Sequence, residues 1–187
     1  MSGDVHVRFC ESVGVRFPGA THLVVLARKL NEKLTEYLES RLEGRFQLEI
    51  NRDKTRVVNL GEPGASLNFL GHTFRFDRDL QGRGKRYLNV FPSEKALKRE
   101  REKLHELTDH RQCFKPTPEL IEGLNRHLKG WKNYFDFGYP RVAFGEINTY
   151  VRDRLTQHLR RRSQRPFRPP EGVSYYRQIQ QFGLVRL

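Results

Sequence analysis

The sequence predicts an α+β protein, with a small antiparallel sheet and one helix followed by a bundle of three helices and a basic tail. Apolar side chains recur at every second position in short runs between residues 46 and 91, which is typical of strands. In three stretches between residues 93 and 162 they recur every three or four positions, which is typical of amphipathic helices. Three such helices in succession must bury their apolar faces against one another, so a bundle is expected.

The first half of the chain opens with a predicted strand and a predicted helix. Leu23–Leu26 is a short, continuously apolar run, which indicates a buried strand. Leucines then recur at every fourth position from Leu30 to Leu42, with charged residues between them, and Gly44 follows as a stop signal. This pattern predicts an amphipathic helix over residues 30–44.

Four more strands are predicted after this helix. They cover Phe46–Ile50, Thr55–Leu60, a run from Leu67 through Gly71 to Phe76, and Tyr87–Phe91. Turns that contain glycine, proline or polar residues separate them.

The three helices of the second half have clear start signals or apolar stripes. Ser93 is a good N-cap for a helix from Glu94 to about Asp109. Thr117-Pro118-Glu119 begins the next helix with a cap, a proline at the first position and an acid near the positive end. The third helix carries an apolar stripe from Phe144 to Leu159.

These patterns divide the chain into four parts. Residues 1–20 are expected to be a disordered or aberrant lead-in, and residues 21–91 to form the α+β unit. Residues 92–162 are the predicted helical domain. Residues 163–187 are rich in arginine, proline and glutamine and are expected to be a basic tail with aromatic and aliphatic anchors near its end.

The charge of the chain favours a polyanionic partner. There are 35 Lys and Arg against 22 Asp and Glu in 187 residues, a formal net charge of +13. A basic protein that neutralises phosphates releases condensed counterions, so nucleic acid is the favoured partner class. An acidic membrane surface and an acidic protein are the alternatives.

Membrane insertion and secretion are not expected. No apolar run approaches the roughly 20 residues that cross a bilayer, and the N-terminus lacks the apolar core of a secretion signal. Cys10 and Cys113 are the only cysteines, too few for a disulfide framework. We therefore expect a soluble cytoplasmic protein with no membrane partner.

Two clusters of side chains suit nucleic acid. Seven arginines fall between Arg152 and Arg168, with a single acid among them. The guanidinium binds phosphate through a fork of donors and also stacks on bases, so we predict RNA contact here, with a merely solvated face as the alternative. In the aromatic segment that starts at Trp131, Trp131 and Phe135 continue a helical stripe and are predicted core residues. Tyr134 and Tyr139 are candidates for exposure and for stacking on unpaired bases.

Other candidate sites have weaker support. Lys54 lies in the turn after a strand, where a lysine can meet a phosphate but is more often solvated. His105, His110 and Cys113 do not follow a zinc-ligand spacing, so no metal site is predicted. No phosphate-binding glycine loop and no catalytic set of Ser, His and Asp can be assigned.

From Leu23 onwards, the order of motifs resembles the C-terminal part of group II intron reverse transcriptases, which are also maturases. Leu23–Arg28 is similar to the apolar strand that follows the family's Tyr-Ala-Asp-Asp turn, and Leu48–Thr55 to the palm segment with a conserved lysine, here Lys54. Phe69-Leu70-Gly71 looks like the turn that grips the primer. Leu124–Phe135, with its Leu-Asn, Gly-Trp and Asn-Tyr-Phe elements, resembles the maturase-specific thumb region. The resemblance implies a partial palm-like sheet and a thumb-like bundle.

One departure from the family bears on catalysis. In register with the apolar strand, the Tyr-Ala-Asp-Asp positions hold Gly19-Ala20-Thr21-His22, so both metal-binding aspartates are missing. Two-metal phosphoryl transfer needs carboxylates that hold the ions. The resemblance therefore implies no catalytic residue, no metal or other cofactor, and no polymerase activity for this chain alone. Mg²⁺ is expected only for a complete polymerase of this family.

Three hypotheses follow from the resemblance and the charge. The favoured one is the RNA-binding maturase module of a truncated reverse transcriptase, which holds structured RNA, and group II intron RNA in particular, without covalent chemistry. The second is a part of a polymerase that a separate palm and fingers polypeptide completes, and the third is a gene remnant without function. The residues predicted to bind RNA are Lys54, Lys129, Lys132, Tyr134, Arg154, Arg160, Arg161, Arg162, Arg165 and Arg168, and the predicted primer-grip-like turn is Phe69, Leu70 and Gly71.

Overall fold

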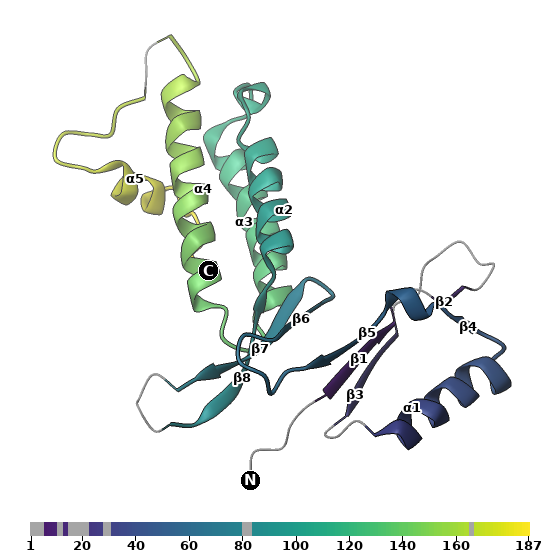
Figure 1. Cartoon of the computed structure of the whole chain (residues 1–187). Helices are drawn as coiled ribbons and strands as arrows, with labels where there is room; N and C mark the ends of the chain where they lie inside the picture. The colour runs from purple at the N-terminus through teal and green to yellow at the C-terminus, as the bar shows by residue number, and fades with distance from the viewer. Residues whose placement is uncertain (1–5, 11–12, 15–22, 28–30, 80–83, 165–166) are drawn as a thin grey trace. The chain divides into compact units, whose positions relative to one another are not determined.

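The computed structural model describes residues 6–10, 13–14, 23–27, 31–79, 84–164 and 167–187 (Figure 1). The chain forms two compact units. The first comprises Met1–Leu67 and Phe74–Leu88, and the second comprises Asn68–Thr73 and Asn89–Leu187. Antiparallel strands and helices are both present, which confirms the predicted α+β fold class.

A three-stranded antiparallel sheet with the order β3-β1-β5 organises the first unit. The edge strands β3 (Leu23–Ala27) and β5 (Thr55–Asn59) were predicted from their apolar runs. The central strand β1 (His6–Cys10) falls within the lead-in, where no regular element was expected. Arg8 pairs with Val25 on one side and with Val57 on the other. The backbone of β1 is therefore satisfied by segments distant in sequence, which a local pattern does not reveal.

The predicted helix of the first unit is present, but the strand predicted after it is much shorter. Helix α1 (Glu32–Glu39) is capped by the Asn31 side chain and continues into the π-helical turn η1 (Ser40–Arg45). Only β4 (Glu49–Ile50), which pairs with β2 (Val13–Gly14), remains of the strand predicted over residues 46–50. Gln47 has a φ of 51°, which lies outside the β region and interrupts the strand. The short 3-10 turn η2 (Arg52–Lys54) leads into β5.

The run through Gly71 forms two strands, so the prediction of one continuous strand is wrong. Strands β6 (Ser66–Phe69) and β7 (His72–Arg78) are joined by a tight turn, and the sheet order is β6-β7-β8, with β8 covering Arg86–Pro92. Leu70 and Gly71 have φ values of 48° and 80°, the left-handed backbone of a two-residue hairpin turn. Glycine adopts this backbone without steric cost, whereas Leu70 adopts it with some strain.

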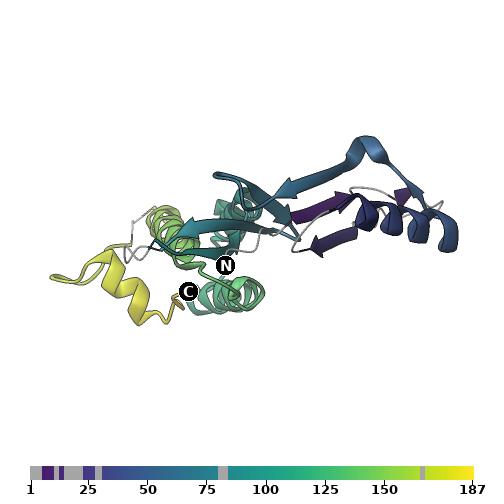
Figure 2. The ribbon, with the colours of Figure 1, turned by 60° about the horizontal axis from the view of Figure 1, so that its bottom comes forward.

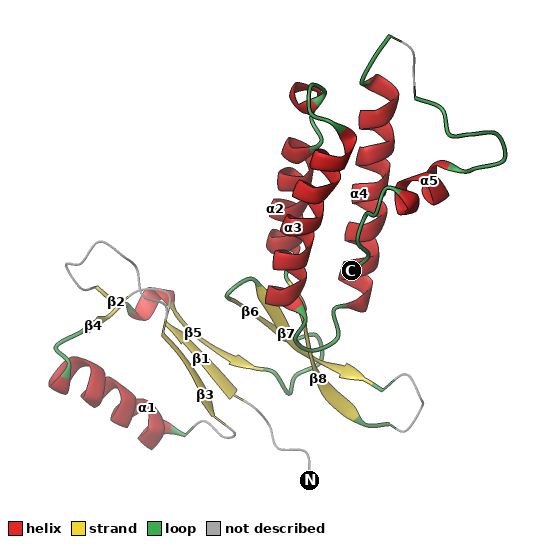
Figure 3. Ribbon diagram, turned by 180° about the vertical axis from the view of Figure 1, so that it is seen from behind, coloured by secondary structure: helices red, strands yellow, loops and turns green. Residues whose placement is uncertain are grey.

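The three predicted helices of the second unit lie side by side, as Figure 1 and Figure 3 show. They are α2 (Glu94–Leu107), α3 (Thr117–Phe135) and α4 (Arg141–Arg161). The Ser93 hydroxyl accepts a hydrogen bond from the Ala96 amide at 3.3 Å and caps α2, as predicted. Helix α3 begins one residue earlier than expected, with Pro116 at the N-cap position, because Thr117 already has helical geometry.

The core of the second unit lies between these helices, which Figure 2 shows nearly end on. Leu104, Leu128, Ile147 and Leu155 are fully buried in it. The predicted core position of Phe135 is confirmed, and Trp131 is half-buried against the rings of Phe135 and Phe144. None of the helices in the described ranges has both the length and the apolar character needed to cross a membrane.

The C-terminal segment packs on the bundle through a short fifth helix. Helix α5 (Tyr175–Gln181) lies beside α4 in Figure 1 and Figure 3. Ile179 on α5 is 2% exposed and belongs to the same core as the three long helices. The partly buried anchors around it are Phe167, Phe182, Leu184, Val185 and Leu187. The aromatic and aliphatic residues expected to anchor the tail thus pack against the core.

Candidate RNA interface

The Phe69-Leu70-Gly71 turn, which resembles a primer grip in sequence, lies at one end of the second unit. The Gly71 carbonyl accepts a hydrogen bond from the Ser93 amide at 2.8 Å, and the Tyr134 hydroxyl donates to the Leu70 carbonyl at 2.9 Å. A Cβ at Gly71 would lie 3.4 Å from the Phe135 ring, and the φ of 80° would strain any other residue there. The turn is therefore held rigidly against the C-terminal end of α3.

Large apolar side chains are exposed at this same end, which we call the aromatic end. Its members are Leu70, Tyr134, Phe137, Tyr139 and Val142, each more than half exposed. The predicted exposure of Tyr134 and Tyr139 is thereby confirmed, at 55% and 60%. Exposed apolar groups in such number mark a binding surface more often than plain surface. Phenol rings in this setting are suited to stacking on unpaired bases.

A glycine with left-handed backbone lies in the aromatic end and closely approaches a neighbouring strand. Gly138 has a φ of 86°, and a Cβ there would lie 2.3 Å from the Val90 carbonyl oxygen. The same oxygen accepts a hydrogen bond from the Tyr139 amide at 3.0 Å. The segment between α3 and α4 therefore presents its rings from a fixed backbone, which lowers the entropy lost on binding.

Basic residues of α3 precede the aromatic end. Lys129 is exposed and Lys132 is half-buried. Both were predicted to bind RNA, and this role stays a prediction.

Four of the predicted arginines, Arg154, Arg160, Arg161 and Arg162, lie in the last turns of α4 or at its C-cap, where two of them join the helices. Half-buried Arg154 donates from Nε to the Thr108 hydroxyl at 3.2 Å and from Nη1 to Gln157 at 3.1 Å. Arg162 donates from Nη1 to the Thr117 hydroxyl. These bonds tie the end of α4 to the end of α2 and to the start of α3, so both arginines have a structural role as well as a charge.

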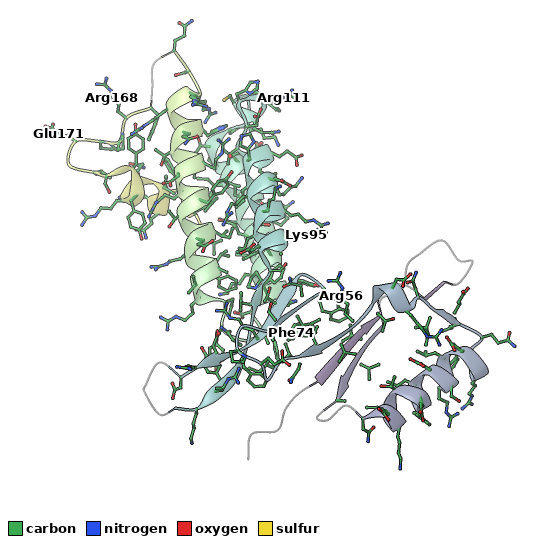
Figure 4. All side chains as sticks on the ribbon, viewed as in Figure 1. Arg56, Phe74, Lys95, Arg111, Arg168 and Glu171 are labelled. Carbon is green, nitrogen blue, oxygen red and sulfur yellow. The ribbon has the colours of Figure 1, made fainter. Side chains whose placement is uncertain are left out.

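The other arginines of this end present their charge to solvent. Arg160 and Arg161 are exposed, and the Arg160 guanidinium lies over the Tyr175 ring, 4.7 Å from its centroid. Arg168 is exposed on the loop that precedes α5 (Figure 4). Arg152, which belongs to the predicted arginine cluster but not to the list of individual RNA-binding residues, lies over the Tyr176 ring at 5.4 Å. Its partner ring comes from the C-terminal segment, and no local pattern in the sequence connects the two.

A small pocket of about 80 Å³ lies beside Arg154 and Arg161 and is lined also by His158. His158 is 3% exposed, and its Nδ1–H donates to the Thr108 carbonyl at 3.1 Å. Burial disfavours the charged ring and lowers the pKa of His158 below 6.5, and the positive charges of Arg162 and Arg154 add to this effect. The imidazole is therefore neutral at pH 7, and its buried Nε2 has no hydrogen-bond partner within the described ranges.

His105, His110 and Cys113 line this same pocket. Within the part of the chain that the structure describes, no three His, Cys, Asp or Glu side chains are placed to hold a metal ion. The absence of a metal site stays a prediction for the whole chain.

The structure does not describe every predicted position in full. Nothing is described for Arg165 or for the Gly19–His22 segment, and only the backbone of Lys54 is described, at the end of the turn η2. Their proposed roles stay predictions.

The second unit is a basic helical domain that carries exposed rings and arginines. Residues 97–171 match the family model described as group II intron, maturase-specific domain. This match identifies a group II intron maturase-specific domain in the chain and confirms the predicted resemblance to the C-terminal part of a group II intron maturase. Such a domain indicates a maturase-related function on group II introns and, in general, binding of intron RNA. No curated protein matches the chain.

Proposed function

We propose that this chain is an RNA-binding maturase module that holds folded group II intron RNA and stabilises its splicing-competent form without covalent chemistry by protein side chains. The observation that carries the proposal is the aromatic end, which lies on a rigid backbone next to basic residues of the maturase-specific domain. Burying exposed rings against unpaired bases supplies affinity, and a fixed backbone reduces its entropic cost.

The arginines at the other end of α4 extend this proposed surface. Val142 and Arg160 are 18 positions apart, which corresponds to about 27 Å along a helix. An RNA that touches both ends would place unpaired bases on the rings and backbone phosphates near the arginines. Base contacts would then favour particular unpaired structures, and phosphate contacts would supply affinity that depends on salt.

Equilibrium binding of the purified chain to a folded group II intron RNA across a salt series tests the proposal. An equal-length RNA duplex serves as the competitor. A preference for the intron RNA that persists at higher salt supports a maturase module. Equal binding of both RNAs, with the same steep loss on adding salt, would leave only a basic surface and contradict the proposal.

A variant pair connects the test to the aromatic end. Phe137→Ser and Tyr139→Ser together are expected to reduce the preference for intron RNA. The two exposed rings would no longer be present to stack on unpaired bases. Thr149→Ala, an exposed change on α4, is the matched control. Loss of intron preference in both proteins, or in neither, would argue against a role for these rings.

Incomplete burial in the first unit favours a second candidate, a polymerase part completed by a separate palm and fingers polypeptide. Helix α1 is amphipathic but has no buried residue, and Tyr37, Phe46 and Val57 are each at least half exposed. An apolar surface of this kind suits a protein partner. We propose no polymerase activity for the chain alone, because the Gly19–His22 segment lacks the two aspartates. Restored reverse transcription on adding a palm and fingers polypeptide would favour this candidate.

A further inference from the structure

We propose that α5 and the residues after it form part of the RNA-binding surface, because they hold Arg152 and Arg160 in place for phosphates of the RNA backbone. This inference rests on the proposed function and deepens it by adding α5 and Arg152 to the surface that meets the phosphodiester backbone. The family match ends at residue 171, so α5 and the C-terminal residues lie beyond the matched part.

Two arginine–tyrosine stacks connect α4 to α5. The Arg160 guanidinium lies 4.7 Å from the centroid of the Tyr175 ring, and that of Arg152 lies 5.4 Å from the Tyr176 ring. The arginines are eight positions apart, a little over two turns and about 12 Å along the helix. Their partners are adjacent in sequence, so one short helix orders two separated charges.

Stacking leaves the donors of arginine free for phosphate. A guanidinium carries five N–H donors, more than contact with one ring can occupy. The ring also restricts the rotamers of a long side chain that would otherwise lose entropy on binding. For Arg152 the nearest carboxylate is that of exposed Asp153, at 3.8 Å, and such a solvent-exposed pair contributes little. Phosphate can therefore compete for Arg152.

The two tyrosines are themselves fixed. The Tyr175 hydroxyl donates to the Phe167 carbonyl at 2.6 Å, and the Tyr176 hydroxyl accepts a hydrogen bond from Gln180 at 2.9 Å. The Ser174 side chain caps α5, and Ile179 anchors the helix in the core. The rings of Tyr175 and Tyr176 therefore belong to a helix that Ile179 anchors in the core.

Two asparagines on the long helices fasten the chain after α5. Asn125 on α3 donates to the Gly183 carbonyl and accepts from the Val185 amide, both at 2.8 Å. Asn148 on α4 donates to the Leu187 carbonyl at 3.2 Å and accepts from its amide at 3.0 Å. Each asparagine side chain pairs with one backbone C=O and one backbone N–H, as a neighbouring strand would. Asn125 and Asn148 are therefore positioning residues for the surface that α5 orders.

A double-mutant cycle tests the proposal, with affinity for folded group II intron RNA as the readout. One pair of changes is Tyr175→Leu with Tyr176→Leu, and the other is Arg152→Gln with Arg160→Gln. When both arginines are present, loss of the rings is expected to weaken binding about fivefold or more, given the strength of exposed cation–π pairs. When the arginines are already glutamine, loss of the rings is expected to have no further effect.

The cycle separates this inference from the proposed function. A wild-type protein that does not bind the RNA would remove both. If the wild type binds but the leucine pair weakens binding equally in both backgrounds, the rings act without the arginines and the inference is wrong. No effect of the leucine pair in either background would overturn it as well. Tyr175→Phe with Tyr176→Phe keeps both rings but loses the two hydroxyl hydrogen bonds, and is expected to bind more tightly than the leucine pair.

A variant that does not disturb packing gives an independent test. Arg152→Lys with Arg160→Lys keeps both charges but loses the planar group that stacks on the rings. Intron RNA affinity is expected to fall about fivefold, with an unchanged melting temperature. Affinity equal to that of the wild type would show that charge alone suffices, and would overturn the proposal. Tighter binding of an acidic peptide than of RNA by the wild type would assign the surface to a protein partner instead.

Discussion

At the scale of single residues, His158 makes the stability of the helical unit depend on pH. Its ring is buried, and its pKa is lowered from 6.5 by that burial, with Arg162 and Arg154 adding repulsion. In the unfolded chain the ring takes up a proton near pH 6.5. Below this pH the unfolded state therefore binds more protons than the folded state, and the free energy of unfolding falls as the pH is lowered further.

The His158→Asn variant isolates this effect. An asparagine amide can still donate to the Thr108 carbonyl but does not titrate. Urea unfolding at pH 7.5 and at pH 5.5 is expected to show a smaller loss of stability in the variant than in the wild type. Other titrating groups are the same in both proteins. Equal losses would mean that His158 is not the group responsible.

Gly138 is the residue on which the backbone of the aromatic end depends most. Because Gly138→Ala combines a left-handed φ with a Cβ 2.3 Å from the Val90 oxygen, it is expected to destabilise the protein by at least about 1–3 kcal/mol. Gly145→Ala on α4 is the matched control, since nothing lies within 4 Å of its Cβ. The control is expected to be neutral or to stabilise by about 0.5–1 kcal/mol. Denaturant unfolding of the two variants compares them, and similar stabilities would contradict this account.

At the scale of elements, local signals determined what can be predicted from the sequence. The helices α2, α3 and α4 were predicted because their signals are local: the Ser93 cap for α2, a cap and a proline for α3, and an apolar stripe for α4. Strand β1 and the hairpin of β6 and β7 were not, because pairing with distant strands and the backbone at Leu70 decide them. The anchoring of α5 likewise depends on Asn125 and Asn148 of other helices.

The same limit applied to the candidate site. Tyr134 and Tyr139 were candidates for exposure because the helical stripe that buries Phe135 does not include them, and both are exposed. The bonds of Arg154 and Arg162 to threonines of other helices did not follow from any local pattern. Arginine composition therefore located the basic region, and only the tertiary contacts separated its structural members from its exposed ones.

The C-terminal element has a testable contribution to stability. Asn148→Ala removes both hydrogen bonds to Leu187, and the unfolding free energy is expected to fall by about 1–2 kcal/mol. Hydrogen exchange should become faster in α5 while α2 and α3 keep their protection. Asn133→Ala, an exposed change on α3, is the control. Unchanged exchange in α5 would show that Asn148 does not hold this segment.

At the scale of the whole molecule, the net charge of +13 attracts any polyanion, so the question is whether the position of the charge matters. Arg160 and Arg161 are exposed at the end of α4, and Lys95 and Lys98 are exposed on α2, where Figure 4 labels Lys95. Changing either pair to glutamate alters the net charge by the same amount. The arginine pair is expected to weaken intron RNA binding more, and to reduce the salt slope by about 1.5–2, if each arginine contacts one phosphate.

Melting temperatures of both variants should stay near that of the wild type, because all four side chains are exposed. Equal losses of affinity from the two pairs would mean that only net charge drives binding, and the arginines of α4 would then lose their assigned role. A larger loss from the lysine pair would move the phosphate contacts to α2. A larger loss from the arginine pair, with a shallower salt slope, would place RNA on the face of α4 that α5 orders, where Arg152 and Arg160 are held in position for phosphate.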